Sequence, residues 1–150
     1  MSQEYVIEQL YQIGSRLIAY GNYFENRMGL SLPQLFLLYK MLGWSDEIDG
    51  KLSISSLSQK TGLSKSTVCS TVQTLKRLGY LTKNISNVDN RRKEIVLTEK
   101  ANAISSQITE QIQRLDQQLC CGIPPHELQT IRRTLWQIAE NMHQQPVRAP

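Results

Sequence analysis

The stretch from Ser53 to Thr98 constrains the fold more than any other part of the chain. It predicts, in order, a short helix, a tight turn, a second helix, a strand, a basic loop and a second strand. The first helix is expected to begin after Ser53, whose hydroxyl can accept from unpaired backbone amides. It should end at Gly62, which tolerates the left-handed backbone of a helix end. Ser64 is then expected to cap the second helix, which should end at Gly79.

The second predicted helix has two different faces. Apolar residues recur at helical spacing on one face and are expected to point into a core. These are Val68, Val72, Leu75 and Leu78. The opposite face carries short hydroxyls, one amide and one guanidinium, which suit DNA base edges and phosphates. These are Ser66, Ser70, Gln73 and Arg77. A solvated helix face would show the same pattern, so this stripe alone leaves both interpretations open.

The residues after the second helix predict a β-hairpin. Strands are expected over 81–86 and 94–98, with Ile95 and Leu97 on one face. The polar turn 87–92 between them ends in two adjacent arginines. Two helices joined by a short turn, followed by a hairpin with a basic tip, form a winged helix-turn-helix. In that arrangement the second helix enters the major groove of DNA, and the tip reaches the narrow minor groove or its flanking phosphates.

The net positive charge of the chain is confined to the same part of the sequence. Residues 51–100 contain ten Lys and Arg against three acids, a balance of +7, whereas residues 1–50 carry −3 and residues 101–150 are neutral. A local concentration of this kind is what neutralisation of DNA phosphates requires. The pI near 9.1 of the whole chain agrees with an anionic partner.

These segments together resemble the MarR family of bacterial transcription regulators. The resemblance rests on Gly62–Val68, on Leu75–Leu81, and on Asp89–Arg91 followed by a strand in Ile95–Lys100 that ends in Leu-Thr. It extends to Leu32–Gln34 and to the flanking long helices, and it therefore covers nearly the whole chain. It implies a transcription regulator that represses by occupying its operator.

We therefore expect a mainly α (α+β) fold, a single MarR-type domain over residues 1–150. Residues 31–99 should form the winged helix-turn-helix lobe with its small β wing. Residues 1–30 and 100–145 should supply long dimerisation helices, expected over about 3–27, from Thr98 to about 121, and from Pro124–Pro125 onward.

The terminal helices carry more apolar residues than a winged helix needs to cover itself, which favours a homodimer. The stripe in the first of them is Val6, Leu10, Ile13, Leu17, Tyr20 and Phe24. The resemblance likewise implies that the terminal helices of two chains interlock. Two-fold symmetry would then place the second helices about 34–36 Å apart in successive major grooves, on an inverted-repeat operator in double-stranded DNA.

Ten residues are expected to contact DNA. They are Ser64, Lys65, Ser66, Thr67, Ser70, Gln73, Arg77, Arg91, Arg92 and Lys93. Arg91 matches the wing arginine of the family, and Asp89 is expected to fix the wing turn. Lys65 stands at a helix N-terminus, where amides and the helix dipole favour phosphate. Ser70 departs from the family, many of whose members have a basic residue there, while Gln73 can read an adenine edge.

The resemblance also implies a ligand pocket between the dimerisation helices and the winged lobe. Tyr11, Arg16, Tyr20 and Tyr23 are the residues we expect to line it, and they would suit a small aromatic acid. Core or interface roles explain the same four residues. An effector bound there would release DNA by favouring a different spacing or angle of the two lobes.

Three cysteines are present, and because two of them are adjacent we expect no disulfide framework. Cys69 lies at the edge of the second helix, which leaves a cysteine-based redox-sensing regulator open as an alternative. The family's peroxide-sensing branch uses a cysteine in the first helix, where this sequence has none. Cys120 and Cys121 could join His126 in a metal site, although we predict neither a metal nor a cofactor.

Other classes of function find little support. The sequence contains no Gly-x-Ser-x-Gly motif, Walker loop or dinucleotide fingerprint, so we do not expect an enzyme. No apolar run approaches the roughly 20 residues that span a bilayer, and residues 1–4 lack the pattern of a signal peptide, so we expect a cytoplasmic protein with no membrane partner. The competing hypothesis is a winged helix that binds another protein and has no specific affinity for DNA.

Overall fold

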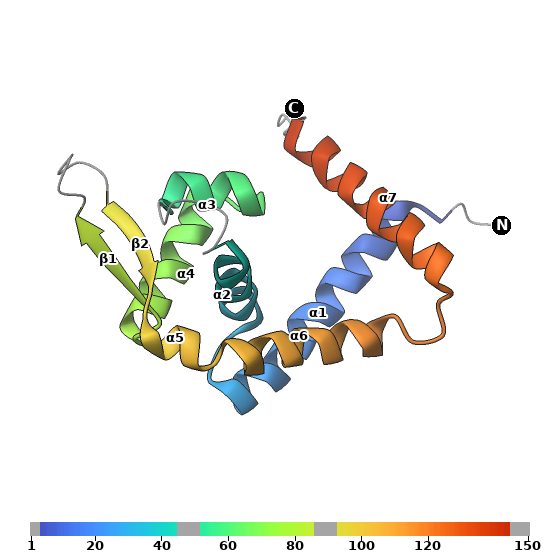
Figure 1. Ribbon diagram of the computed structural model, residues 1–150. Helices are drawn as coiled ribbons and strands as arrows, with labels where there is room; N and C mark the ends of the chain where they lie inside the picture. Colours follow the sequence, from blue (N-terminus) through green and yellow to red (C-terminus); the bar gives the residue numbers. More distant parts are fainter. Residues whose placement is uncertain (1–3, 45–51, 86–92, 145–150) are drawn as a thin grey trace. The chain divides into compact units, whose positions relative to one another are not determined.

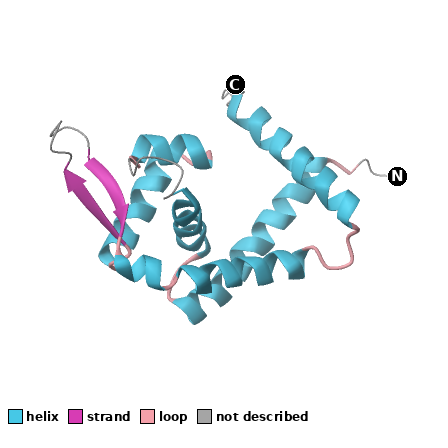
Figure 2. Cartoon of the chain, in the orientation of Figure 1, coloured by secondary structure: helices cyan, strands magenta, loops and turns pink. Residues whose placement is uncertain are grey.

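A computed structural model describes residues 4–44, 52–85 and 93–144. Those residues form four helices, then one two-stranded antiparallel sheet, then three more helices (Figures 1 and 2). The chain divides into two compact units, residues 1–105 and residues 106–150. The mainly α fold with a small β wing is therefore confirmed.

The first unit begins with α1 (Val6–Met28), which ends at Gly29 in the left-handed backbone conformation (φ 69°). Helix α2 (Leu32–Trp44) follows directly after Ser31, so Pro33 occupies the first turn as expected. The expected loop from Trp44 to Lys51 lies mostly outside the described residues, although Trp44 itself still belongs to α2.

The helix-turn-helix consists of α3 (Ile54–Thr61) and α4 (Lys65–Arg77). Ser53 and Ser56 form a reciprocal capping box, each side chain accepting from the backbone amide of the other. Gly62 takes the left-handed conformation with φ 72°, and the Ser64 side chain accepts from the Thr67 amide to cap α4. The predicted start and end of α3 and the predicted start of α4 are confirmed because these local caps fix them, whereas α4 ends at Arg77, two residues before the expected Gly79.

The wing is a hairpin of β1 (Leu81–Ile85) and β2 (Lys93–Leu97), paired antiparallel with Leu81 opposite Leu97. The second strand thus begins and ends one residue earlier than expected. Leu52 adds a single bridge to the sheet, accepting a 2.7 Å hydrogen bond from the Ile95 amide. This bridge, which the sequence did not predict, ties the hairpin to the chain just before α3.

The core of the first unit is built around α4, which packs against α2, α3 and β1 (Figure 1). Its fully buried side chains include three of the four that the pattern placed inward on the second helix, whereas Leu78 lies just past the end of α4 and is half-buried. The core residues are Leu35, Leu38, Met41, Leu57, Val68, Val72, Leu75, Leu81 and Ile95. Burial of one face of α4 leaves the opposite face at the surface.

The prediction of one long helix from Thr98 to residue 121 was wrong. Thr98 does cap a helix, but α5 (Glu99–Ala103) ends after five residues and α6 (Ser105–Leu119) begins anew. At the break, the Ile104 amide bonds to Ala101 three residues back instead of four, which tightens the last turn and interrupts the helix.

The second unit holds most of α6 and all of α7 (Pro125–Gln144). Large apolar side chains of α7 are exposed, among them Leu135 at 47% and Met142 at 67%. The same holds in α1, where Val6 is 58% and Ile13 54% exposed. Several apolar side chains of α1 and of α7 are therefore exposed. None of the described helices is long and apolar enough to cross a membrane.

Candidate nucleic-acid interface

The outward face of α4 is polar along its whole length. Ser66, Ser70, Gln73 and Arg77 are exposed, as are Lys65 and Thr67 in the first turn. Behind them Val68 and Leu75 are fully buried. The structure therefore brings the seven predicted contacts from Ser64 to Arg77 together on one helix.

Hydroxyl groups organise the N-terminal half of α4. The Ser64 and Thr67 hydroxyls lie 2.9 Å apart, and the Ser64 oxygen also accepts from the Thr67 amide at 3.2 Å. The Ser70 hydroxyl donates to the Thr67 carbonyl at 3.1 Å. Because its proton is used within the helix, Ser70 presents an acceptor outward, which suits the exocyclic amino group of a base.

The turn between α3 and α4 is held by side chains of α3. The Ser58 hydroxyl donates to the Leu63 carbonyl at 2.6 Å, and the Leu63 amide donates to the Thr61 hydroxyl at 3.3 Å. The Thr61 hydroxyl in turn donates to the Leu57 carbonyl at 2.7 Å. These bonds set the direction in which α4 leaves α3.

Lys100 joins the C-terminal end of α4 to the base of the wing. Its ammonium group donates to the Leu78 carbonyl at 2.6 Å and lies 4.5 Å from the centre of the Tyr80 ring. The Thr98 hydroxyl donates to the Gly79 carbonyl at 2.7 Å. A cation at this position also interacts favourably with the negative end of the helix dipole. Sequence reasoning missed this role, although Lys100 stands at the end of the Leu-Thr-Glu-Lys segment that carries the family resemblance.

The remaining predicted DNA contacts belong to the hairpin. Arg91 and Arg92 lie outside the described residues, as does Asp89. Lys93 is the first residue of β2, and its side chain is likewise outside the description. The contact of the wing with DNA therefore stays a prediction.

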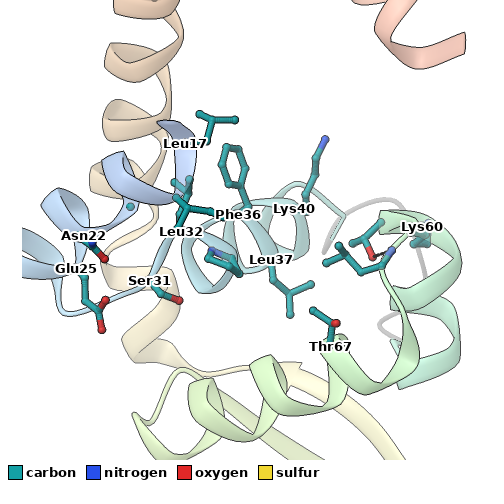
Figure 3. A pocket seen from close by; sticks show the side chains of 15 residues that line it. Leu17, Asn22, Glu25, Ser31, Leu32, Phe36, Leu37, Lys40, Lys60 and Thr67 are labelled. Carbon is teal, nitrogen blue, oxygen red and sulfur yellow. Dashed lines mark hydrogen bonds between the residues drawn. The ribbon is translucent and has the colours of Figure 1, made fainter. Parts of the chain in front are cut away.

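A cavity of about 720 Å³ lies within the first unit (Figure 3). Its wall is mostly apolar and comes from α1, α2 and the α3–α4 turn. The lining includes Leu17, Ile18, Leu32, Phe36, Leu37, Thr61, Leu63 and Thr67. The labelled Leu17 and Thr67 stand at opposite ends of the hollow in Figure 3. The cavity therefore extends from α1 to the first turn of α4.

Three charged residues also line this cavity: Glu25, Lys40 and Lys60. The Lys60 ammonium lies 4.9 Å from the centre of the Trp44 ring, where it is held by a cation–π contact. Glu25 lies on the side of the hollow away from Lys40 and Lys60 in Figure 3, so the side with the lysines suits the negative charge of a small, mostly apolar ligand. Sequence reasoning did not identify these lining residues.

The four residues expected to bind an effector lie along α1 but do not line this cavity. Tyr11 is 76% exposed and borders a separate shallow groove with Ile7, Glu8 and Gln12. The Tyr23 hydroxyl accepts a 2.9 Å hydrogen bond from Arg27. Arg16 and Tyr20 are exposed. The structure thus spreads the four along α1, and the cavity described above does not include them.

All three cysteines are free thiols. Cys69 is half-buried on α4, and the Gln73 amide lies 3.8 Å from its sulfur. Among the residues that the structure describes, no three His, Cys, Asp or Glu side chains stand close enough together to hold a metal ion.

Two helices joined by a capped turn, an exposed polar second helix and a hairpin at its end define a winged helix-turn-helix protein. Comparison of the sequence with family models agrees, since residues 47–84 match the IclR helix-turn-helix domain. That match spans the helix-turn-helix and the start of the wing. No curated protein sequence matches the chain significantly.

Solved structures place this fold among MarR-family regulators. A MarR protein from Peptoclostridium difficile DA00132 superposes with a TM-score of 0.80 at 16% identity, covering 96% of this chain and 91% of that one. A putative MarR-family regulator from Listeria monocytogenes, complexed with 26mer DNA, gives 0.80 at 15% identity, with 95% and 91% covered. BpsR of Bordetella bronchiseptica, whose DNA binding is regulated by 6-hydroxynicotinic acid, gives 0.78 at 20% identity, with 91% and 94% covered. The chain therefore has the winged helix-turn-helix fold of MarR-family regulators over nearly its whole length.

Proposed function

We propose that this chain is a MarR-type transcription regulator, a repressor that binds an inverted-repeat operator as a homodimer and is released by a small aromatic effector. The observation that carries the proposal is the outward face of α4, which is polar and exposed while its inner face is fully buried. Such a regulator acts in the cytoplasm and requires neither catalytic activity nor a cofactor.

Binding of α4 in the major groove would use its two ends differently. At the N-terminus, Lys65 and the backbone amides of the first turn would hold a phosphate. Farther along, Ser70 and Gln73 would read base edges. Arg77 would reach a phosphate at the far side of the groove. The comparison structure from Listeria contains 26mer DNA, which supports this role for the fold.

The wing would add a second contact. Arg91 and Arg92 stand in the sequence between β1 and β2, in the segment with the highest positive charge. An arginine inserted beside the major-groove helix would enter the adjacent minor groove, where the negative potential is strongest. Lys93 would contact the backbone nearby.

Dimerisation would cover the exposed apolar side chains of the terminal helices. Tyr11 is 76% and Ile18 75% exposed in α1, and Trp136 is 62% exposed in α7. Isolated apolar side chains at a surface are ordinary, but exposed rows along two long helices mark an interaction surface. A two-fold dimer through these rows would present two α4 helices to one face of the duplex.

The cavity between α1, α2 and the α3–α4 turn is where we place the effector. DNA binding of BpsR is regulated by 6-hydroxynicotinic acid, a small ring with a carboxylate. A ligand of that kind would set its ring against Phe36 and its carboxylate near Lys40 or Lys60. Because Leu63 and Thr67 also line the cavity, the ligand would touch the start of α4 directly. Tyr11, Arg16, Tyr20 and Tyr23 stay predictions for contacts outside this cavity.

The test of DNA binding is fluorescence anisotropy of a labelled duplex from the DNA upstream of the protein's own gene, against a scrambled duplex of equal length. Specific binding should persist as salt is raised, whereas binding to the scrambled duplex should weaken steeply, by about 0.9 in log K per phosphate contact for each unit of log salt. Equal binding to both duplexes would contradict specificity for that sequence.

The competing function is a protein-interaction module. The observation in its favour is the uncharged middle of the α4 face, where the exposed side chains of Ser70 and Gln73 carry no charge. Absence of duplex binding at low salt would support this alternative, because non-specific affinity for phosphate is then strongest. A redox-sensing regulator would instead lose DNA affinity on oxidation of Cys69, and the Cys69→Ser variant would abolish that loss.

A further inference from the structure

The hydroxyl protons in the middle of α4 are directed back into the helix. The Ser70 hydroxyl donates to the Thr67 carbonyl at 3.1 Å, and the Thr74 hydroxyl donates to the Ser70 carbonyl, also at 3.1 Å. Ser70 is exposed and Thr74 is half-buried. A hydroxyl has one proton and two lone pairs, so each of these side chains has only acceptor capacity left. The two residues stand one helical turn apart and therefore share one side of α4.

The side-chain amide of Gln73 is oriented by the residue one turn before it. Its nitrogen Nε2 donates to the Cys69 sulfur at 3.8 Å. Because the amide group is planar, a nitrogen held toward Cys69 turns the amide oxygen away from that residue. Gln73 is exposed, whereas Cys69 is half-buried. The oxygen of Gln73 is therefore a third acceptor at the surface of this part of the helix.

Charged donors stand at the two ends of the same helix. Lys65 begins α4 and Arg77 ends it, and both side chains are exposed. Residues 69–74 between them carry no charged side chain. We call Ser70, Gln73 and Thr74 the acceptor turn. Phosphates require donors, so the ends of α4 suit the DNA backbone and the acceptor turn suits a different partner.

The edges of the bases in the major groove offer both kinds of group. Adenine N6 and cytosine N4 are amino donors, whereas purine N7, guanine O6 and thymine O4 are acceptors. A protein acceptor placed against a base acceptor leaves both without a partner, which is costly once water is excluded. The bidentate contact of a glutamine with adenine needs the amide nitrogen at N7. In Gln73 that nitrogen is bonded to Cys69.

We propose that the acceptor turn of α4 reads the exocyclic amino groups of adenine and cytosine and makes no contact with purine N7. The inference rests on the proposed function, because it requires α4 to enter the major groove of an operator. It adds the chemical group by which the middle of the helix recognises a base pair. The positions of those amino groups would set sequence specificity, while Lys65 and Arg77 fix the register through phosphates.

The experiment uses a duplex that the native protein selects from a random library, with base analogues placed one position at a time. Purine deoxyriboside removes the amino group of adenine, and pyrimidin-2-one deoxyriboside removes that of cytosine. The 7-deaza purines remove N7 from the same base pairs. In the anisotropy assay, loss of an amino group under the acceptor turn should weaken binding about 2- to 10-fold, the worth of one hydrogen bond. Loss of N7 from those base pairs should leave the affinity unchanged.

A variant of Ser70 separates contact from weakened base pairing. Ser70→Ala should weaken binding of the native duplex and remove the effect of amino-group loss at one base pair of each half-site. Ser66→Ala is the matched control, because it makes the same truncation one turn earlier on the same face. Whatever its own affinity, Ser66→Ala should keep the effect at that base pair. An analogue weakens base pairing equally for every variant, so a loss of sensitivity in Ser70→Ala alone identifies the contact.

Variants of Cys69 test the orientation of the Gln73 amide. Cys69→Ala removes the acceptor that holds Nε2 and should make binding sensitive to loss of N7 from an adenine. Cys69→Ser supplies another acceptor and should stay insensitive. Circular dichroism establishes that each variant is folded.

Two results would overturn the inference and leave the proposed function standing. One is a loss of affinity on removal of N7 as large as that on removal of the amino group. The other is a selected duplex in which no amino group matters, or one at which Ser70→Ala and Ser66→Ala behave alike. Failure of the native protein to enrich any sequence would instead refute the proposed function itself, and this inference with it.

Discussion

Replacement of Lys100 by Met should loosen the junction between α4 and the wing. Met keeps an unbranched stem of similar length but removes the charge, and with it the hydrogen bond to the Leu78 carbonyl and the contact with the Tyr80 ring. The perturbation therefore separates the polar role of Lys100 from its packing.

The expected magnitude follows from those two contacts. A hydrogen bond to a charged group contributes about 1.5–3 kcal/mol when protected, and Lys100 is exposed, so we take about 1 kcal/mol. An exposed cation–π contact adds about 0.5–1 kcal/mol. Lys100→Met should therefore lower the free energy of unfolding by about 1.5–2 kcal/mol.

Urea unfolding followed by circular dichroism measures this loss. The matched control is Lys76→Met, which removes the same charge from the exposed last turn of α4 and should change stability by less than about 0.5 kcal/mol. In the anisotropy assay, Lys100→Met should weaken duplex binding more than the control because the wing loses its fixed direction. Equal effects of the two variants on both quantities would refute the assigned role of Lys100.

The other predictions concern the wing, the core, the dimer and the cavity. Arg91→Ala should weaken duplex binding by about 1–3 kcal/mol in the anisotropy assay while the mass from light scattering stays unchanged; undiminished binding would remove the wing from the mechanism. Leu75→Ala, at a fully buried position, should cost about 2–5 kcal/mol in urea unfolding. Leu135→Glu should shift the light-scattering mass from dimer to monomer, and an unchanged mass would exclude this face of α7. Lys40→Met should weaken the binding of 6-hydroxynicotinic acid measured by calorimetry. An affinity equal to that of the native protein would show that the carboxylate does not bind near Lys40.

Local features of the sequence predicted the local structure well. The caps at Ser53 and Ser64 and the left-handed Gly62 involve residues no more than a few positions apart, so the chemistry that sets each boundary is visible in a short window. The inward and outward faces of α4 follow from helical spacing alone. The helix-turn-helix was therefore predictable almost residue by residue.

Features formed between distant segments were not predictable in the same way. The cavity joins Leu17 in α1, Phe36 in α2 and Thr67 in α4, and no pattern in the sequence states that these side chains share one hollow. The bridge between Leu52 and Ile95 also joins residues that are far apart in the sequence, so no short window of sequence predicts it. The break at Ile104 is local, but it rests on a shift from four-residue to three-residue hydrogen bonding that composition does not reveal.

Thr67 connects the proposed effector site to the proposed DNA contact, and its energetics limit how release can work. Its hydroxyl completes the α4 cap with Ser64, its carbonyl accepts from Ser70, and the residue lines the cavity. Loss of one cap costs about 1 kcal/mol, which would change affinity only about five-fold. Nearly complete release requires about 5.5 kcal/mol of differential binding. An effector must therefore displace the whole α3–α4 turn, through Thr61 and Leu63 as well as Thr67, and do so in both protomers of the proposed dimer.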